Sequence, residues 1–353
     1  NRKDFTHLER AVAVLSASSK PVILAGGGCI LGKAEAELLV LAEKCTLPVA
    51  TTLMGKGAFP ENHPLSLGMV GMHGTPQANL AVSEAEVILA LGTRFSDRST
   101  GGKKFYAPKA TIIHVDLDEA ELGKNIPASF PILGNTQKVL SKMLEKLPVQ
   151  KDRSPWIDTI AAWRRNYPLR EKTPPGALSV PGILGEIRKR HEEEGILTTD
   201  VGQHQMWAAL HYEVNRSRTY LTSGGLGTMG FGLPAAIGAA FAHPGERVVC
   251  VAGDGGFLMN IQELETCRRY NLPITIVLCN NGSLGMVRQW QDLFFQQRFS
   301  GTCENPTCSF IEVARAFGLE AHSASNQEEL ERALDQGFAS SGPPGGMLRP
   351  SRG

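Results

Sequence analysis

Short apolar runs alternate with helical patterns along most of the chain. Runs of five or six apolar residues bounded by glycine, proline or polar residues are typical of buried strands, and apolar positions spaced by three or four residues indicate helices. The predicted strands lie at residues 21–25, 48–52, 87–91, 111–115, 247–252 and 274–279, and the predicted helices at 34–44 and 257–270. Strands that alternate with helices favour an α/β fold, here with two domains that each contain a doubly wound parallel sheet.

Chain length and proline content suggest the domain boundaries. With 353 residues, the chain is long enough for two domains with complete cores. Residues 1–150 are predicted to form the first domain, residues 151–180 a proline-rich linker, and residues 181–342 the second domain.

One short helix is predicted inside the linker. Ser154 is its expected N-cap and Pro155 its first residue, because proline is tolerated in the first turn. Trp156, Ile160 and Trp163 line one face of this helix, which indicates packing rather than ligand binding.

The last residues, 343–353, are predicted to form an aberrant tail. Their prolines and glycines argue against a strand. We interpret this end as frameshifted or truncated, and we expect it to leave an unpaired edge on the second sheet.

Two polar motifs follow neighbouring strands of the second domain. Gly253-Asp254-Gly255 follows one strand and Asn280-Asn281 the next, so Asp254 and Asn281 are expected at the same edge of a parallel sheet. A carboxylate, an amide oxygen and a nearby carbonyl suit Mg²⁺, which often binds through phosphates. The glycines allow a diphosphate to approach the backbone at a helix N-terminus. Either motif alone is typical of an ordinary turn or polar loop, but together they predict a thiamin-diphosphate site.

The first domain carries a weaker nucleotide signal. Gly26-Gly27-Gly28 follows its first strand and Asp116 ends a later one, as a nucleotide site at the sheet edge requires. Leu31 stands where the last glycine of G-x-G-x-x-G would be, so the dinucleotide fingerprint is incomplete. Ordinary turns remain the alternative interpretation.

Composition narrows the partners and the compartment. The net charge is +1 with no long basic or acidic run, which indicates no nucleic-acid partner and no anionic membrane surface. No run approaches a membrane span, the first residues do not form a signal peptide, and we expect a cytoplasmic location, or a plastid or mitochondrial one in a eukaryote. The seven cysteines include no C-x-x-C pair, which predicts reduced structural thiols, with metal binding by Cys303 and Cys308 as the alternative.

Several longer stretches resemble one enzyme family from about residue 20 to residue 343. They are residues 26–29 (GGGC), 52–57 (TLMGKG), 71–75 (GMHGT), 94–98 (RFSDR), 123–125 (GKN), 199–207 (TDVGQHQMW), 222–238 (TSGGLGTMGFGLPAAIG) and 284–290 (LGMVRQW). Together with the two polar motifs, these stretches are similar to the catalytic large subunit of acetolactate synthase, also called acetohydroxyacid synthase.

The resemblance implies an activity, cofactors and partners. The activity is the decarboxylation of pyruvate and its condensation with a second pyruvate or with 2-oxobutyrate, which gives 2-acetolactate or 2-aceto-2-hydroxybutyrate in branched-chain amino acid biosynthesis. The cofactors are thiamin diphosphate and Mg²⁺, with FAD in a largely structural role. The family forms homo-oligomers, dimers or tetramers, and a regulatory small subunit is a further expected partner.

The resemblance also implies residue roles in the second domain. The Mg²⁺ ligands would be Asp254, Asn281 and the backbone carbonyl of Ser283. The residues around thiamin diphosphate would be Gly202, Gln203, His204, Met229, Gly253, Asp254, Gly255, Gly256, Asn281, Gly285 and Met286. Met229 would support the bent cofactor, and Met286, Val287 and Trp290 would line the substrate channel. For these side chains, ordinary packing is the competing interpretation.

In the first domain the resemblance implies an FAD site. Its expected residues are Gly26, Gly27, Gly28, Thr52, Leu53, Met54, Met72, His73, Gly74, Arg94, Asp97, Arg98, Asp116 and Asn135. Arg98 would also face the pyruvate carboxylate, with a surface ion pair to Asp97 as the alternative. Asn135 stands where the family usually has aspartate.

The sequence departs from the family at its start. Family members begin with a pyrimidine-binding domain that carries a catalytic glutamate, and no residue of this sequence is assigned to that role. We therefore expect low activity from the chain alone. Two alternatives stay open: another thiamin-diphosphate carboligase or oxidase, which residues 284–290 argue against, and a non-catalytic cofactor-binding protein.

Overall fold

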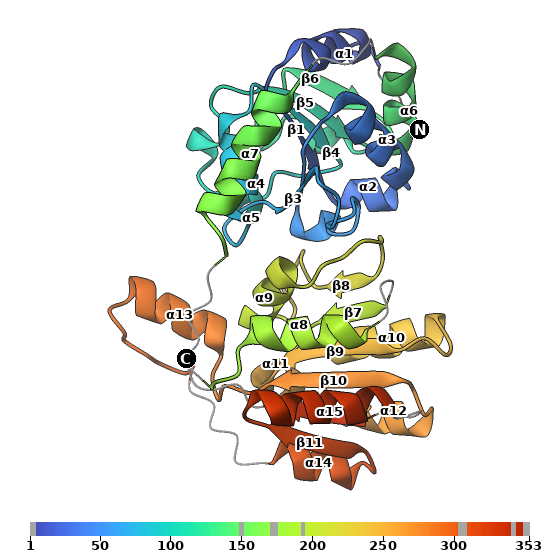
Figure 1. Ribbon diagram of the computed structural model, residues 1–353, viewed down its shortest axis with the longest axis vertical. Coiled ribbons are helices and arrows are strands. Elements are labelled where there is room, and N and C mark those ends of the chain that lie inside the picture. Colours follow the sequence, from blue (N-terminus) through green and yellow to red (C-terminus); the bar gives the residue numbers. More distant parts are fainter. Residues whose placement is uncertain are drawn as a thin grey trace. The chain divides into compact units, whose positions relative to one another are not determined.

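The computed structural model describes residues 5–147, 152–169, 176–191, 195–302, 309–339 and 344–348. It divides into two compact units (Figure 1). The first contains residues 1–170 and 213–218, and the second contains residues 171–212 and 219–353.

The first unit is built on a six-stranded parallel sheet in the order β3-β2-β1-β4-β5-β6. The strands are β1 (Pro21–Ala25), β2 (Val49–Thr51), β3 (Ser66–Met69), β4 (Val87–Leu91), β5 (Thr111–Asp116) and β6 (Phe130–Leu133). The helices are α1 (Leu8–Ala17), α2 (Gly27–Leu31), α3 (Glu35–Cys45), α4 (Pro76–Glu84), α5 (Asp97–Thr100), α6 (Thr136–Lys146) and α7 (Ser154–Asn166). The predicted doubly wound parallel sheet is confirmed, and its strand order is that of dinucleotide-binding folds.

Helices cover both faces of this sheet, which explains why its central strands, β1 and β4, are apolar throughout. Along β1, Ile23 packs in the core that contains α1, α3 and α6, whereas Val22 and Leu24 pack in the core that contains α4 and α7. Successive residues of a strand point to opposite faces, so a strand buried on both sides needs an unbroken apolar run.

The helix predicted for the linker belongs instead to the first unit. Trp156 and Ile160 of α7 are buried in the core that β1 and α4 share, and the indole Nε1 of Trp156 donates a hydrogen bond of 3.1 Å to the carbonyl of Pro21. The guanidinium of Arg153, also buried, donates to backbone carbonyls that include those of Leu15 and Cys45. A linker starting at residue 151 is therefore not what the structure shows.

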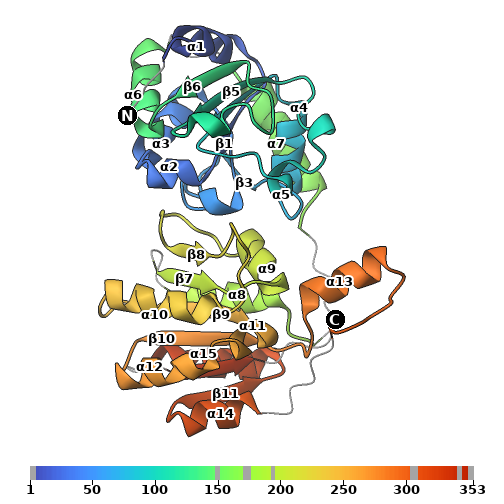
Figure 2. The ribbon, with the colours of Figure 1, turned by 180° about the vertical axis from the view of Figure 1, so that it is seen from behind.

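The second unit has another six-stranded parallel sheet, in the order β11-β12-β10-β9-β7-β8. The strands are β7 (Ile196–Thr199), β8 (Tyr220–Thr222), β9 (Val248–Gly253), β10 (Ile274–Cys279), β11 (Glu320–Ala324) and β12 (Pro344–Leu348). The helices are α8 (Val180–Arg190), α9 (Gln203–His211), α10 (Gly232–Ala242), α11 (Asp254–Leu258), α12 (Leu264–Arg269), α13 (Gly285–Phe294), α14 (Phe310–Ala316) and α15 (Gln327–Ala339). Figures 1 and 2 show α8 and α15 on one face of the sheet and α10 and α12 on the other.

The prediction that the tail contains no strand was wrong for residues 344–348. These residues form β12, which pairs in parallel with β10 on one side and β11 on the other, so this position in the sheet is filled. Pro344 is the first residue of the strand, where proline is tolerated, and backbone pairing on both sides compensates for the weak strand propensity of the two glycines that follow it.

The helix predicted at residues 257–270 is also divided. It consists of α11, a 3₁₀ turn at Ile261–Glu263 and α12. The break lies at Asn260, whose φ of −134° is not helical and whose side-chain amide donates 2.7 Å to the carbonyl of Gly230. The hydrogen bond from Asn260 to the neighbouring loop therefore interrupts the helix at this residue.

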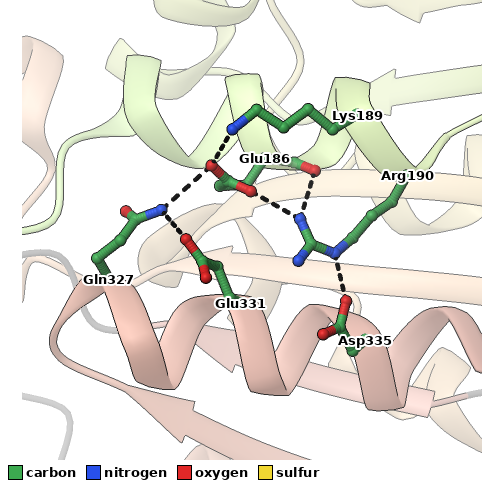
Figure 3. Close-up of polar contacts among 6 residues, drawn as sticks. All are labelled: Glu186, Lys189, Arg190, Gln327, Glu331 and Asp335. Carbon is green, nitrogen blue, oxygen red and sulfur yellow. Dashed lines mark hydrogen bonds and ion pairs between the residues drawn. The ribbon is translucent and has the colours of Figure 1, made fainter.

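A polar cluster ties α8 to α15 (Figure 3). The buried carboxylate of Glu186 accepts hydrogen bonds from Lys189 Nζ at 2.6 Å, Arg190 Nη1 at 2.7 Å and Gln327 Nε2 at 3.1 Å. Arg190 Nε donates to Asp335 at 2.6 Å. Residues about 140 positions apart in sequence are thus joined by charge-assisted hydrogen bonds.

The described cysteines match the prediction of reduced structural thiols. Cys29, Cys45, Cys250, Cys267 and Cys279 are free and buried. Cys303 and Cys308 lie outside the described residues. None of the helices that the structure describes has the length and apolarity that a bilayer crossing requires.

Candidate functional site

The carboxyl ends of three adjacent strands bring polar residues together in the second unit. Asp200, Asp254 and Asn281 follow β7, β9 and β10, which are neighbours in the sheet. The amide of Asp200 donates to the carbonyl of Val251, and Cys279 is paired in register with Gly253. The strand order reverses at β7, and such a reversal in an open α/β sheet is where ligands bind.

A hydrogen bond joins the start of α11, at Asp254, to the separate loop that carries Asn281. Asp254, which is 2% exposed, begins α11, and its Oδ2 accepts a hydrogen bond of 2.6 Å from the amide of Gly282. Its Oδ1 accepts 3.0 Å from the amide of Gly255. Burial raises the pKa of the Asp254 carboxyl, against the effect of these amide donors. Asn281 Oδ1 in turn accepts 3.0 Å from the amide of Ser283.

The oxygen atoms of these residues are compatible with the predicted Mg²⁺ site. Among the residues that the structure describes, no group of three His, Cys, Asp or Glu side chains is arranged to hold a metal. The predicted ligands are instead one carboxylate, one amide oxygen and one backbone carbonyl, which is the hard oxygen chemistry of a cation that also binds phosphate.

Two glycines pack closely against polar side chains next to these loops. A Cβ on Gly285 would lie 2.2 Å from Gln203 Oε1 and 2.9 Å from Asn281 Nδ2. A Cβ on Gly256 would lie 2.2 Å from Asp200 Oδ1. Gln203, Asn281 and Gly285 therefore lie close together, with no room for a Cβ between them, and their contact with a diphosphate stays a prediction.

His204 presents a buried nitrogen that the described residues do not satisfy. Its Nε2 has no hydrogen-bond partner among them, and its ring lies against Gly202 and Gly253, where a Cβ would approach to 2.9 Å and 3.0 Å. Burial lowers the pKa of His204 to about 4, although the charge and backbone of Asp200 raise it. An anionic ligand here would favour a proton on Nε2, which fits a diphosphate.

Asp200 is a residue that sequence reasoning did not assign. It is 1% exposed, and its carboxylate accepts hydrogen bonds from the amides of Val201 at 2.7 Å, Gly230 at 3.1 Å and Gly232 at 2.9 Å. It thereby fixes the loop that carries Met229, which is half-buried. An acid directly after a strand, two residues before a glycine, was the signal that could have identified it.

The predicted channel residues lie on an exposed helix. Met286 is half-buried, Trp290 is 38% exposed and Val287 is 49% exposed, and α13 contains no buried residue. The ring of Trp290 meets that of Phe294 edge to face at 5.7 Å. These side chains are not part of the hydrophobic core of the second unit, so core packing does not explain them. Their role at a channel stays a prediction.

In the first unit, the expected FAD residues follow the carboxyl ends of the strands. Gly26, Gly27 and Gly28 follow β1; Thr52, Leu53 and Met54 follow β2; Met72, His73 and Gly74 follow β3; Arg94, Asp97 and Arg98 follow β4; Asp116 ends β5; and Asn135 follows β6. Because all six strands are parallel, these residues lie at one edge of the sheet.

At the centre of that edge, glycines pack against each other where the strand order reverses. The amide of Gly28 donates 3.0 Å to the carbonyl of Gly92, and a Cβ on Gly28 would lie 2.5 Å from Gly92 Cα. A Cβ on Gly27 would lie 3.2 Å from the side chain of Met54. The glycines therefore allow the turns after β1 and β4 to pack closely, and FAD binding at this edge stays a prediction.

The remaining candidates have local partners. The amide of Met72 donates 2.9 Å to the carbonyl of Arg98, and burial together with the charge of Arg98 lowers the pKa of His73. Arg98 is exposed, and its backbone amide donates to Asp97 Oδ1. Burial raises the pKa of Asp116.

Asn135 serves as the N-cap of α6. Its Oδ1 accepts 3.2 Å from the amide of Lys138, and its Nδ2 donates 3.4 Å to the carbonyl of Gly32. Asparagine caps a helix as well as the aspartate that the family usually has. The capping role is therefore kept, and a nucleotide contact at this position stays a prediction.

Two family profiles match this chain. The profile described as "Thiamine pyrophosphate enzyme, central domain" matches residues 8–143, and "Thiamine pyrophosphate enzyme, C-terminal TPP binding domain" matches residues 200–344. The chain belongs to the family of thiamine pyrophosphate (thiamin diphosphate) enzymes.

Within that family, the chain is similar to acetolactate synthase large subunits. It is 45% identical over 345 residues to the probable acetolactate synthase large subunit of Methanocaldococcus jannaschii, an alignment that covers 95% of this chain. It is 45% identical over 337 residues to the large subunit of Buchnera aphidicola subsp. Schlechtendalia chinensis, and 42% identical over 335 residues to the isozyme 3 large subunit of Escherichia coli, each over 93% of this chain. The chain spans 58% of the length of each of these relatives.

Proposed function

We propose that this chain is the flavin-binding and diphosphate-binding part of an acetolactate synthase large subunit, a transferase of branched-chain amino acid biosynthesis. The observation that carries the proposal is the loop structure in which Asp254 and Asn281 lie together at the edge of the second sheet. The similarity to acetolactate synthase large subunits supports the particular reaction.

The proposed residue roles follow from this site. Asp254, Asn281 and the carbonyl of Ser283 hold Mg²⁺, and the diphosphate binds beside Gln203, His204 and the glycines that pack against them. Thiamin diphosphate, when bound, supplies the electron sink that decarboxylation of a 2-oxo acid requires. His204 would donate a hydrogen bond from Nε2 to that ligand, because a bound anion favours a proton on this buried nitrogen.

The proposed substrates are pyruvate as donor and pyruvate or 2-oxobutyrate as acceptor. Arg98 binds a substrate carboxylate, Met229 supports the cofactor, and Met286 and Trp290 line the channel and exclude water. FAD binds at the edge of the first sheet in a structural role. The intact enzyme is a homo-oligomer that works with a regulatory small subunit in the cytoplasm.

The test measures cofactor binding first and activity second. Titration calorimetry is expected to detect thiamin diphosphate binding with Mg²⁺ and none with a chelator. Acetolactate formation from pyruvate is expected only when the chain is joined to the amino-terminal part of the Escherichia coli relative, because no residue here is assigned as the catalytic glutamate. No Mg²⁺-dependent binding would contradict the site, and equal turnover with and without the added part would contradict this assignment of the catalytic acid.

A further inference from the structure

Six residues that connect two elements of the second unit fold with the first unit. Glu213–Arg218 lie between α9 and β8 in sequence, yet they group with the first unit. The chain therefore passes from one unit to the other three times instead of once.

A buried ion pair of the first unit lies where this segment attaches. Lys56, which is 3% exposed, follows the turn after β2, and its Nζ lies 2.6 Å from both carboxylate oxygens of Glu61. The two side chains are 1% and 12% exposed. Removing two charges from water is costly, so such a pair persists only with close geometry and further hydrogen bonds.

Glu61 supplies those further hydrogen bonds to the segment. Its Oε2 accepts 2.8 Å from the amide of Val214, and its own amide donates 3.2 Å to the carbonyl of Val214. The amide of Asn62 donates 3.1 Å to Asn215 Oδ1. The Glu61 carboxylate thus accepts hydrogen bonds from both the Lys56 ammonium and the Val214 amide. The lysine therefore fixes the orientation of the carboxylate that binds Val214.

The segment is closely tied to α9 in sequence. Tyr212, which is 1% exposed, ends α9, and its hydroxyl bonds to Arg188 at 3.0 Å and to His191 at 2.8 Å within the second unit. Val214, 2% exposed, is anchored in the first unit. One residue, Glu213, separates these anchors, so the Cα atoms of Tyr212 and Val214 lie at most ~7 Å apart. A shift of Val214 is therefore transmitted to α9.

We propose that Lys56 and Glu61 form a clasp on segment 213–218 that positions α9, and through its first turn the diphosphate-binding residues Gln203 and His204. The clasp stands on the geometry of the first unit alone. Its effect on cofactor affinity rests on the proposed function. Lys56 and Glu61 are positioning residues, because they act through Val214 and α9.

The experiment uses the full chain with three substitutions. Lys56→Met removes the charge and keeps the length of the side chain, Lys56→Arg keeps the charge, and Lys146→Met removes the lysine of the exposed pair with Glu9 as a matched control. The readouts are tryptic cleavage after Arg216 in the native state, hydrogen exchange of the Val214 amide, and thiamin diphosphate affinity with Mg²⁺.

Lys56→Met is expected to speed both cleavage and exchange and to weaken the cofactor affinity by about three- to tenfold. Lys56→Arg is expected to restore all three, and Lys146→Met to leave them unchanged. If Lys56→Met does not fold, Glu61→Gln replaces it, because it removes the charge and keeps an acceptor for Val214.

Each contradictory outcome points to a different claim. Unchanged cleavage and exchange in the folded variant overturn the clasp. Faster cleavage with unchanged affinity overturns the positioning of α9. If the unsubstituted chain does not bind thiamin diphosphate, the proposed function fails and the positioning claim fails with it, while cleavage and exchange still decide whether the clasp exists.

Discussion

The carboxylate of Asp254 accepts a hydrogen bond of 2.6 Å from the backbone amide of Gly282, so the two polar motifs that flank the β9–β10 pair form one structure. The bond joins the start of α11 to the loop after β10. The charge at Asp254 therefore orients the loop of Asn281, and we propose that it also binds a cation.

Substitutions of Asp254 are expected to separate these two roles. Asp254→Asn keeps an oxygen that can accept from Gly282 but removes the charge, and Asp254→Ala removes both. We expect both variants to lose Mg²⁺-dependent thiamin diphosphate binding beyond detection by calorimetry, because the only charged metal ligand proposed here is lost. Hydrogen exchange of the Gly282 amide should rise in Asp254→Ala alone. Asp158→Ala, on the exposed surface of α7, is the control, and unchanged affinity in Asp254→Asn would reject the metal assignment.

The contact between Gly28 and Gly92 predicts a strong effect of one methyl group. Gly92 has a φ of +54°, and a Cβ there would lie 2.4 Å from Gly28 Cα. Gly92→Ala is expected to destabilise the first unit by about 2–4 kcal/mol through backbone strain and overpacking. Urea unfolding followed by tryptophan fluorescence measures this. Gly102→Ala, where the nearest atom would be 3.6 Å away, should change little, and equal midpoints for the two variants would contradict the packing argument.

Strand positions were predictable because they depend on local apolar runs. The strand β1 and the strand β10 have the predicted limits, since each is buried on both faces and needs five or six consecutive apolar residues. The prediction for β12 failed because its stability comes from backbone pairing with β10 and β11, which the local composition does not reveal.

The sequence also did not reveal that α7 packs in the first unit. A proline-rich stretch usually connects domains, but here Trp156 bonds to a carbonyl 135 residues earlier in the chain. The candidate sites were predictable where the ligands follow strand ends, as Asp254 and Asn281 do. The contact of Lys56 and Glu61 with Val214 was not predictable, because Glu61 and Val214 are 153 residues apart in the sequence.

The cluster on α8 and α15 predicts unequal effects of two acidic residues (Figure 3). Glu186→Ala removes the acceptor shared by Lys189, Arg190 and Gln327, and should cost about 1–3 kcal/mol because charge-assisted hydrogen bonds to a buried carboxylate are lost. Asp335→Ala breaks a pair whose carboxylate is 68% exposed, and should cost below about 1 kcal/mol. Urea unfolding of both variants measures the difference. Equal losses in the free energy of unfolding would show that the burial of Glu186 does not determine how much it contributes to stability.

The buried ring of His191 is expected to make the stability of the fold depend on pH. Its Nδ1 lies 2.8 Å from the hydroxyl of Tyr212 and its Nε2 lies 3.1 Å from the carbonyl of Arg247, so a neutral ring satisfies both partners. Burial, aided by the charges of Arg188 and Arg247, lowers the pKa of His191 from 6.5 to about 4, although the bond to the Arg247 carbonyl raises it.

Because the pKa is lower in the folded state than in the unfolded state, the unfolded chain binds the proton more tightly. The stability contributed by neutral His191 is therefore fully present above about pH 6.5 and is lost as the pH falls toward about 4, by up to about 3 kcal/mol. His191→Gln keeps a donor and an acceptor but does not titrate. The free energy of unfolding measured in urea from pH 7 to pH 4 should fall more steeply for the unsubstituted chain than for His191→Gln. Parallel pH profiles would show that this histidine does not contribute to the acid sensitivity of the fold.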